Sequence, residues 1–441
     1  MKHFDPKALI DFARYYGFHY DSCDPYALVQ DISVDMQRGL QGQSSSLLMI
    51  PSYLTPVQTV PSGKTVIALD AGGTNFRAAL VHFDTEGKAV PEQTERAPMP
   101  GTGGQVNAKQ FFDQFAELTA PLLERCPDVC GIGFCFSYPT RIGEDADGTV
   151  LAFSKEVDAP EVIGKKVGEG LREALLRRGV KAPERIVLLN DTVATLLSGL
   201  IEMRGAGTGP VIGTILGTGY NTAYPERNIP KIGFASAEEP YIIVCETGNF
   251  AHRYQGYIDK EFDRTTKNPG TYLLEKACSG AYLGPLMLHI TNAGIKDGLL
   301  QFRKQDEFAS WSTLQTKDLN SFLRDPYTKE GALSGLFDPD ESDARAAFTY
   351  LASIVTERAA LFAAAPIAAA VKRITIYDPL NPVRIAIEGT TYFIYKGMRV
   401  ALDSWLHAML SAEKPHPYII TPVEQASLFG AAVAALTTGP R

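Results

Sequence analysis

The chain alternates short apolar runs with longer segments whose apolar residues recur at helical spacing. Runs of strand length lie at 65–70, 76–83, 131–140, 185–191, 211–224 (two strands around a turn), 241–250, 373–378 and 384–389. Helical spacing is found at 6–17, 26–40, 107–124, 161–179, 192–204, 271–289, within 315–372, and at 394–411 and 427–436. This alternation predicts an α/β architecture with sheets covered on both faces.

Two segments share the same strand-turn-strand pattern. Residues 66–80 and 211–224 each place an apolar strand before a glycine-threonine turn and a returning strand. The two lie about 145 positions apart, which suggests duplicated halves that face each other. Two ordinary hairpins that look alike by chance are the alternative, and the pattern alone leaves it open.

Composition narrows the class of protein. The 441 residues are 45% hydrophobic and 21% charged, enough for a large core in two or three domains. A net charge of −8 argues against nucleic acid or an anionic membrane as the main partner. The apolar stretch 359–371 contains Pro366 and is too short to span a bilayer, so it predicts a buried helix. Six scattered cysteines indicate a reducing, cytoplasmic setting.

The first candidate site follows the strand at 65–70. Gly72 and Gly73 allow a tight turn whose bare N–H groups approach an anion, and Thr74 adds a hydroxyl donor. Asp70, at the strand end, could hold Mg²⁺ through water. A glycine hairpin turn capped by an aspartate explains the same residues, so both interpretations stay open here.

A second glycine turn, Gly217-Thr218-Gly219, precedes Asn221. Alone it favours a plain turn. Paired with the first, it favours two facing phosphate loops, because a triphosphate and its metal need donors from two sides.

A third candidate, Asn190-Asp191-Thr192, lies where an apolar strand enters a helix. An aspartate at the carboxyl end of a strand could accept a proton from an alcohol. An ordinary helix N-cap is the more common explanation for this motif alone.

Single polar residues are scattered further along the chain, and a polyhydroxy sugar would need several such partners. They are Ser137, Ser154, Lys155, Asn221, Glu246 and Glu275. Composition does not choose between sugar ligands and ordinary surface or turn residues.

Taken together and in order, segments from about residue 47 to 436 resemble the hexokinase family, which includes eukaryotic hexokinases and glucokinases, within the actin-like ATPase superfamily. The segments are LLMIPSYL, ALDAGGTNFRAALV, GFCFSYP, FSKEV, LLNDTVATL, LGTGYNTAY, CETGNF, NPGTYLLEKACSGAYLG, RAALFAAAPIAAA and IEGTTYF.

The resemblance implies a role for each matching position. Asp191 would be the general base on the C6 hydroxyl of a sugar. The sugar ligands would be Ser137, Ser154, Lys155, Asn190, Asn221, Glu246 and Glu275. The residues around the phosphates and Mg²⁺ would be Asp70 (through water), Gly72, Gly73, Thr74, Asn75, Arg77, Gly217 and Thr218. Gly389, Thr390 and Ser427 would approach the nucleotide.

The resemblance also implies a two-lobed actin-like ATPase (ribonuclease H-like) fold with a central cleft. The small lobe is expected at 63–190 plus 424–441, and the large lobe at 1–62 plus 191–423. The implied activity is ATP- and Mg²⁺-dependent phosphorylation of glucose, mannose or fructose at C6, giving hexose 6-phosphate for glycolysis. Monomer and homodimer are both open.

Two alternatives to this activity remain. Some residues depart from the family pattern: Phe153, Ser154, Glu156, Val157, Glu388 and the segment 425–429. The changes at 388 and 425–429 bear on the nucleotide preference and motivate the first alternative, a non-catalytic sugar sensor, although Asp191 and the two phosphate turns argue against it. An actin- or chaperone-like ATPase is the second; it would not need the sugar ligands together.

Overall fold

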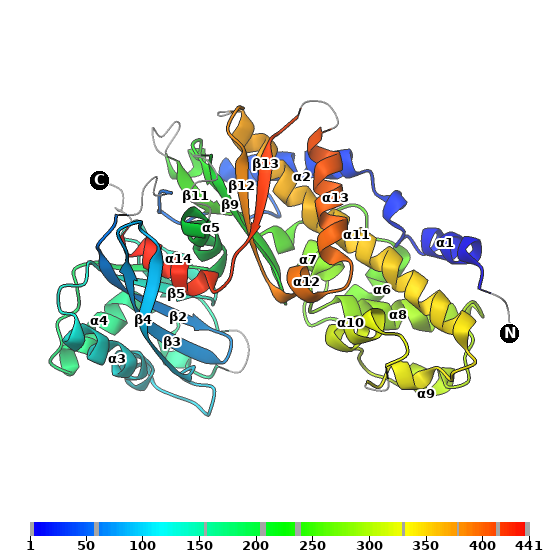
Figure 1. Cartoon of the computed structure of the whole chain (residues 1–441), viewed down its shortest axis with the longest axis horizontal. Coiled ribbons are helices and arrows are strands. Elements are labelled where there is room, and N and C mark those ends of the chain that lie inside the picture. Colours follow the sequence, from blue (N-terminus) through cyan, green and yellow to red (C-terminus); the bar gives the residue numbers. More distant parts are fainter. Residues whose placement is uncertain are drawn as a thin grey trace.

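The computed structural model describes residues 4–56, 61–153, 157–202, 209–233, 240–328, 331–376, 379–411 and 415–436. Two large β-sheets, each covered by helices, dominate it (Figure 1).

The five-stranded sheet has the order β4-β3-β2-β5-β8. Its strands are β4 (Ala89–Pro98), β3 (Asn75–Phe83), β2 (Thr65–Gly72), β5 (Ile132–Phe136) and β8 (Ile186–Leu189). β2 and β3 form the hairpin expected from the first glycine turn, with Gly72 paired to Asn75. β2, β5 and β8 run parallel, so their carboxyl ends meet at one edge.

The six-stranded sheet has the order β1-β11-β10-β9-β12-β13. Its strands are β1 (Ile50–Pro51), β11 (Tyr241–Val244), β10 (Tyr220–Glu226), β9 (Val211–Leu216), β12 (Val383–Glu388) and β13 (Tyr418–Pro422). The β9–β10 hairpin is antiparallel, and β9, β12 and β13 run parallel. Five strands here therefore repeat the order and directions of the other sheet. The similar segments 66–80 and 211–224 form equivalent hairpins in the two sheets.

Helices cover both faces of the five-stranded sheet. α3 (Ala108–Arg125) and α4 (Val167–Arg177) pack on one face through a phenylalanine-rich core. α5 (Asp191–Glu202) and α14 (Ala426–Ala434) cover the other. The backbones approach closely there, because a Cβ at Gly133 would overlap the carbonyl oxygen of Ala431. This contact explains why α14 is built mainly from small residues.

The helix α11 (Ser342–Thr375) runs through the core beside the six-stranded sheet (Figure 1). It packs against α2 (Pro25–Leu40) and α13 (Met398–Ser411). By length and composition it could cross a membrane, but 94% of its most apolar window is buried inside the protein. The stretch 359–371 therefore lies in a buried helix, as expected, although the helix is much longer than the apolar stretch.

Shorter elements complete the chain. The helices are α1 (Pro6–Tyr15), α6 (Tyr257–Thr265), α7 (Leu273–Cys278), α8 (Leu283–Lys296), α9 (Gln305–Ala309), α10 (Thr316–Arg324) and α12 (Thr390–Ile394). The 3₁₀ turns are η1 (Tyr20–Ser22), η2 (Pro160–Val162), η3 (Pro230–Ile232), η4 (Thr247–Asn249) and η5 (Ser334–Leu336). β6 (Thr140–Ile142) and β7 (Gly148–Val150) form a separate hairpin.

Several elements differ from the sequence expectation. The strand expected at 373–378 is wrong, because α11 continues to Thr375; residues 377–378 lie outside the described residues. The single helix expected at 271–289 is two helices, since the Gly280 N–H leaves the helical pattern and donates to the Gly217 carbonyl oxygen at 2.8 Å. The strands β4 and β13 were not expected from the pattern.

The strands divide between the two expected lobes. Every strand of the five-stranded sheet lies within 63–190, and α14 lies within 424–441. Every strand of the six-stranded sheet lies within 1–62 or 191–423. The lobe boundaries themselves stay a prediction.

Candidate active site

The first glycine turn carries a polar cluster. Asp70 is buried, and its Oδ2 accepts hydrogen bonds from Arg77 Nε at 2.9 Å and from Ser427 Oγ at 2.9 Å. Arg77 Nη2 also contacts both residues. Gly73 has φ +64°, a conformation that glycine adopts without strain. The turn therefore places exposed backbone beside a carboxylate that the side chains of β3 and α14 hold in position.

Asn75 and Thr74 form the rim of this turn. Asn75 Nδ2 donates to Thr74 Oγ1 at 3.3 Å. Ser137 follows β5 and lies beside the same turn, because a Cβ at Gly72 would be 3.3 Å from Ser137 Oγ. The Ser137 N–H donates to the Ala71 carbonyl oxygen at 3.0 Å, which fixes the serine at the end of the sheet. A predicted sugar ligand and a predicted phosphate turn are thus adjacent.

The second glycine turn meets the segment expected near the nucleotide. A Cβ at Gly217 would be 3.5 Å from Gly389 Cα. Thr391 Oγ1 donates to the Gly217 carbonyl oxygen at 2.7 Å, and the Ala281 N–H donates to that of Thr218 at 3.0 Å. Gly389 has φ +123°, and Thr390 begins α12 directly after it. The structure therefore brings Gly217, Gly389 and Thr390 to one place.

Two roles were considered for the Asn190-Asp191 motif, helix cap and proton acceptor, and the structure gives the cap to Asn190. Asn190 Oδ1 accepts the Val193 N–H at 2.8 Å, so the asparagine is the helix cap. Asp191 is the first residue of α5, and its Oδ1 accepts a hydrogen bond from Thr192 Oγ1 at 3.2 Å. The helix dipole favours a negative charge at such an N-terminal position.

The two predicted sugar glutamates are held by the start of β10. Asn221 Nδ2 donates to Glu246 Oε1 at 2.9 Å, and the Tyr220 N–H donates to Glu275 Oε2 at 3.0 Å. Glu246 has φ +57°, an uncommon conformation for this residue type. These contacts bring Asn221, Glu246 and Glu275 together.

Electrostatics connects these groups into one site. Burial raises the pKa of Glu246, and the charges of Asp191 and Glu275 raise it further, against the hydrogen bond from Asn221. Burial raises the pKa of Glu388 to about 7, with contributions from the charges of Asp191 and Asp70. The charge of Asp191 therefore contributes to the raised pKa of both Glu246 and Glu388, and Thr195 Oγ1 contacts both the Asp191 carbonyl oxygen at 3.0 Å and Glu388 Oε2.

Glu388 was not among the predicted site residues. It ends β12 as Asp70 nearly ends β2, and Thr195 Oγ1 of α5 donates to its Oε2 at 3.4 Å. A carboxylate at the end of an apolar strand is the signal that identified Asp70, and it could have identified Glu388 too. Ser154 and Lys155 lie outside the described residues.

The donor set fits a bound cation. The charge of Asp70 contributes to the raised pKa of Glu388, and a divalent cation beside the two carboxyl groups would relieve this repulsion. Carboxylate oxygens are the ligands that Mg²⁺ prefers. Asp70, with Glu388 as an additional candidate, would hold the metal.

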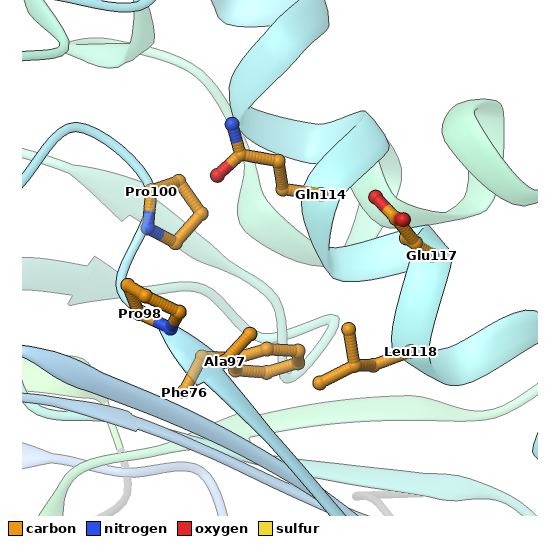
Figure 2. A pocket seen from close by; sticks show the side chains of 7 residues that line it. All are labelled: Phe76, Ala97, Pro98, Pro100, Gln114, Glu117 and Leu118. Atoms are coloured by element: carbon orange, nitrogen blue, oxygen red, sulfur yellow. The ribbon is translucent and has the colours of Figure 1, made fainter. Parts of the chain in front are cut away.

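A cavity of about 330 Å³ lies elsewhere, between the end of β4 and α3 (Figure 2). Its wall is mainly apolar, from Phe76, Ala97, Pro98, Pro100 and Leu118, with Gln114 and Glu117 at α3. It contains none of the predicted sugar or phosphate residues and is therefore not the candidate active site.

Comparisons with known proteins show the family of the chain. Two family models, both described as Hexokinase, match residues 15–201 and 211–437. The chain belongs to the hexokinase family. It is 30% identical over 378 residues to the hexokinase of Schistosoma mansoni, covering 81% of each chain. It is 29% identical to Hexokinase-5 of Oryza sativa subsp. japonica, over 93% of this chain and 86% of that one.

Its match to Hexokinase-3 of Homo sapiens, at 30% identity, covers 82% of this chain and 40% of that longer protein. Membership of the family makes the protein a phosphotransferase of the hexokinase type.

Solved structures give the same answer for the fold. The hexokinase from Schistosoma mansoni complexed with glucose aligns with a TM-score of 0.76 and 25% identity, over 98% of this chain and 99% of that one. A ROK hexokinase from Thermus thermophilus, at 19% identity and a TM-score of 0.50, covers 84% of this chain and 98% of that one, and shares the fold. The protein therefore has the two-domain, actin-like ATPase fold that the sequence predicts.

Proposed function

We propose that this hexokinase transfers the γ-phosphoryl group of ATP to the C6 hydroxyl of glucose or a closely related hexose. One observation carries the proposal: Thr195 Oγ1 contacts both the Asp191 carbonyl oxygen at 3.0 Å and Glu388 Oε2 at 3.4 Å, so Asp191 begins α5 beside the end of β12. The charge of Asp191 also contributes to the raised pKa of Glu246, which Asn221 contacts on the sugar side. A base between a polyol site and an anion site is what phosphorylation of an alcohol requires. Glucose in the solved Schistosoma mansoni relative supports the choice of sugar.

The residues on each side suit their tasks. Glu246, Glu275 and Asn221 present acceptors and an amide to sugar hydroxyls, each of which donates and accepts. The backbone at Gly72–Thr74 and at Gly217–Thr218 presents N–H groups that can approach phosphate oxygens because the glycines carry no side chain. Magnesium, when bound, would neutralise charge on the transferring phosphoryl group.

Asp191 would take the proton from the C6 hydroxyl as O6 bonds to the γ-phosphorus and the bond to the β–γ bridging oxygen breaks, releasing ADP. Loss of a general base costs about 10²–10⁴ in rate. Asp191→Ala should therefore lose turnover by that order while it still binds sugar.

The test is ADP release coupled to a reporter enzyme, with glucose, mannose, fructose and glucosamine against several nucleotides. We expect release that depends on a hexose and on ATP, and that Asp191→Ala nearly abolishes. A protein that binds glucose by calorimetry but releases no ADP with any pair would instead be a non-catalytic sugar sensor.

We further propose that the product feeds glycolysis and that the protein acts in the cytoplasm without nucleic-acid or membrane partners, as monomer or homodimer. All six cysteines are free thiols, which suits a reducing compartment.

Phe153, at a departure from the family pattern, packs against Phe111 and Tyr138 at centroid distances of 5.5 and 5.4 Å. The sugar panel will show whether this change alters the preferred hexose.

A further inference from the structure

The helix α7 (Leu273–Cys278) has only six residues, so its own hydrogen bonds do little to fix its orientation. Two consecutive side chains anchor it to different neighbours. Glu275 accepts the Tyr220 N–H of β10, whereas Lys276 Nζ pairs with Asp263 Oδ1 of α6 at 2.5 Å. Because neighbouring residues on a helix point about 100° apart, two such anchors define the rotation of α7 about its axis.

Lys276 makes two contacts from a buried position. Its side chain is 5% exposed, and besides the ion pair it donates to the Asn268 carbonyl oxygen at 2.7 Å. The other oxygen of Asp263, Oδ2, accepts the Gly270 N–H at 2.8 Å. One ion pair therefore connects α6, the loop that leads into α7, and α7 itself.

The helix α6 is itself tied to the protein core. Asp259, one turn before Asp263, forms a two-pronged, buried ion pair with Arg358 of α11, with both N–O distances at 2.8 Å. His252, which follows the Glu246 loop, contacts the Leu273 carbonyl oxygen through Nε2 at 3.3 Å. His252, Asp259, Asp263 and Lys276 line one small cavity, so the two ion pairs are neighbours.

We propose that Lys276 is a positioning residue for the hexose: by anchoring α7 to α6, it directs the adjacent Glu275 carboxylate toward the sugar. The inference rests on the proposed function, which makes Glu275 a sugar ligand. The charge on Lys276 adds a second effect. Burial raises the pKa of Glu275, while the Tyr220 hydrogen bond and the Lys276 charge oppose that rise and favour the ionised acceptor.

Lys276→Met tests the proposal because methionine keeps much of the side-chain length and removes the charge. We expect the dissociation constant of glucose, measured by calorimetry without ATP, and the KM for glucose to rise at least tenfold. The kcat should stay within about threefold, since Asp191 is untouched. The acidic limb of kcat/KM against pH should move to higher pH as Glu275 becomes easier to protonate.

Two variants serve as controls. Lys260 is an exposed lysine on the same helix α6, so Lys260→Met should bind glucose as the wild type does. Lys276→Arg keeps a cation that can pair with Asp263, so it should recover much of the affinity lost in Lys276→Met. If Lys276→Met does not fold, Asp263→Asn, which keeps the side-chain shape and breaks the same ion pair, should show the same rise in KM. Its acidic limb should not move to higher pH, because the Lys276 charge that favours ionised Glu275 is kept.

The outcomes separate the two proposals. A wild-type protein that phosphorylates no hexose would contradict the proposed function. An active wild type, with folded Lys276→Met and Asp263→Asn variants that keep the normal glucose affinity, would overturn the positioning role alone. A lower melting temperature with unchanged affinity would mean that the ion pair is merely structural.

Discussion

Ser427 of α14 donates a hydrogen bond to Asp70 of β2 at 2.9 Å, although 357 positions separate them in the chain. Arg77 contacts both side chains, so three elements meet at the first glycine turn. The last helix of the described chain thereby supports the carboxylate expected to hold magnesium.

Ser427→Ala removes this support. A hydrogen bond to a charged group contributes about 1.5–3 kcal/mol to stability. Arg77 would still hold the Asp70 carboxylate in the variant, so the loss should be smaller. We expect a loss of about 1–2 kcal/mol in the free energy of unfolding by urea and a several-fold rise in the KM for ATP. Ser404→Ala, at an exposed serine on α13, is the matched control and should change neither quantity measurably. Equal behaviour of the two variants would contradict the role of Ser427.

Gly389→Ala should disturb the second phosphate turn. At φ +123° any side chain is strained, and the new Cβ would overlap the Leu216 carbonyl oxygen and the Gly217 nitrogen. We expect a loss of about 1–3 kcal/mol in stability and at least a tenfold loss in kcat/KM for ATP. Gly103, which has open space around it, provides the control Gly103→Ala. An unchanged KM for ATP in Gly389→Ala would show that this contact does not shape the nucleotide site.

Asn221→Asp should weaken sugar binding. The amide donates to Glu246 at 2.9 Å, and a carboxylate in its place would repel Glu246. Loss of a hydrogen bond to a charged acceptor is worth about 1.5–3 kcal/mol, so the dissociation constant of glucose should rise about 10- to 100-fold. The control is Asn320→Asp, which keeps the side-chain oxygen that accepts the Lys396 N–H. This variant should bind glucose as the wild type does. Calorimetry that finds wild-type affinity in Asn221→Asp would contradict the assignment of this cluster to the sugar.

Local sequence signals predicted the parts of the site that one strand and one turn define. Asp70 and Asp191 are candidates because each lies at the end of an apolar strand, although the local pattern at Asp191 alone favours a helix cap and the family resemblance supplies its catalytic role. Both hairpins formed where a glycine-threonine turn predicted them. Glu388 obeys the same rule, yet it was considered only as a departure from the family pattern.

Contacts between distant segments were not predictable from local pattern. Nothing near Gly280 shows that its N–H leaves the helix to bond Gly217, which is why one helix was expected in place of α7 and α8. Likewise, the short segment Arg373-Ile374-Thr375 suits a strand or a helix equally well, and only its continuity with the buried α11 decides for the helix.

Glu388 predicts an unusual dependence of stability on pH. Its pKa is raised from the ordinary 4.5 to about 7, chiefly by burial and then by the charge of Asp191. Between these two values the folded protein holds a proton that the unfolded chain has lost. The contribution of Glu388 to stability is therefore greatest below pH 4.5, falls as the pH rises toward 7, and is constant above that.

Glu388→Gln should remove this pH dependence of stability, since glutamine stays neutral at every pH. Relative to wild type, the variant should gain stability progressively from pH 5 to about pH 7 and then level off, measured as the free energy of unfolding in urea without nucleotide or magnesium. Glu173→Gln, at an exposed position on α4, should follow the wild-type curve. A difference between Glu388→Gln and wild type that does not change from pH 5 to pH 8 would mean that Glu388 does not titrate in this range, and that burial does not raise its pKa as the structure indicates.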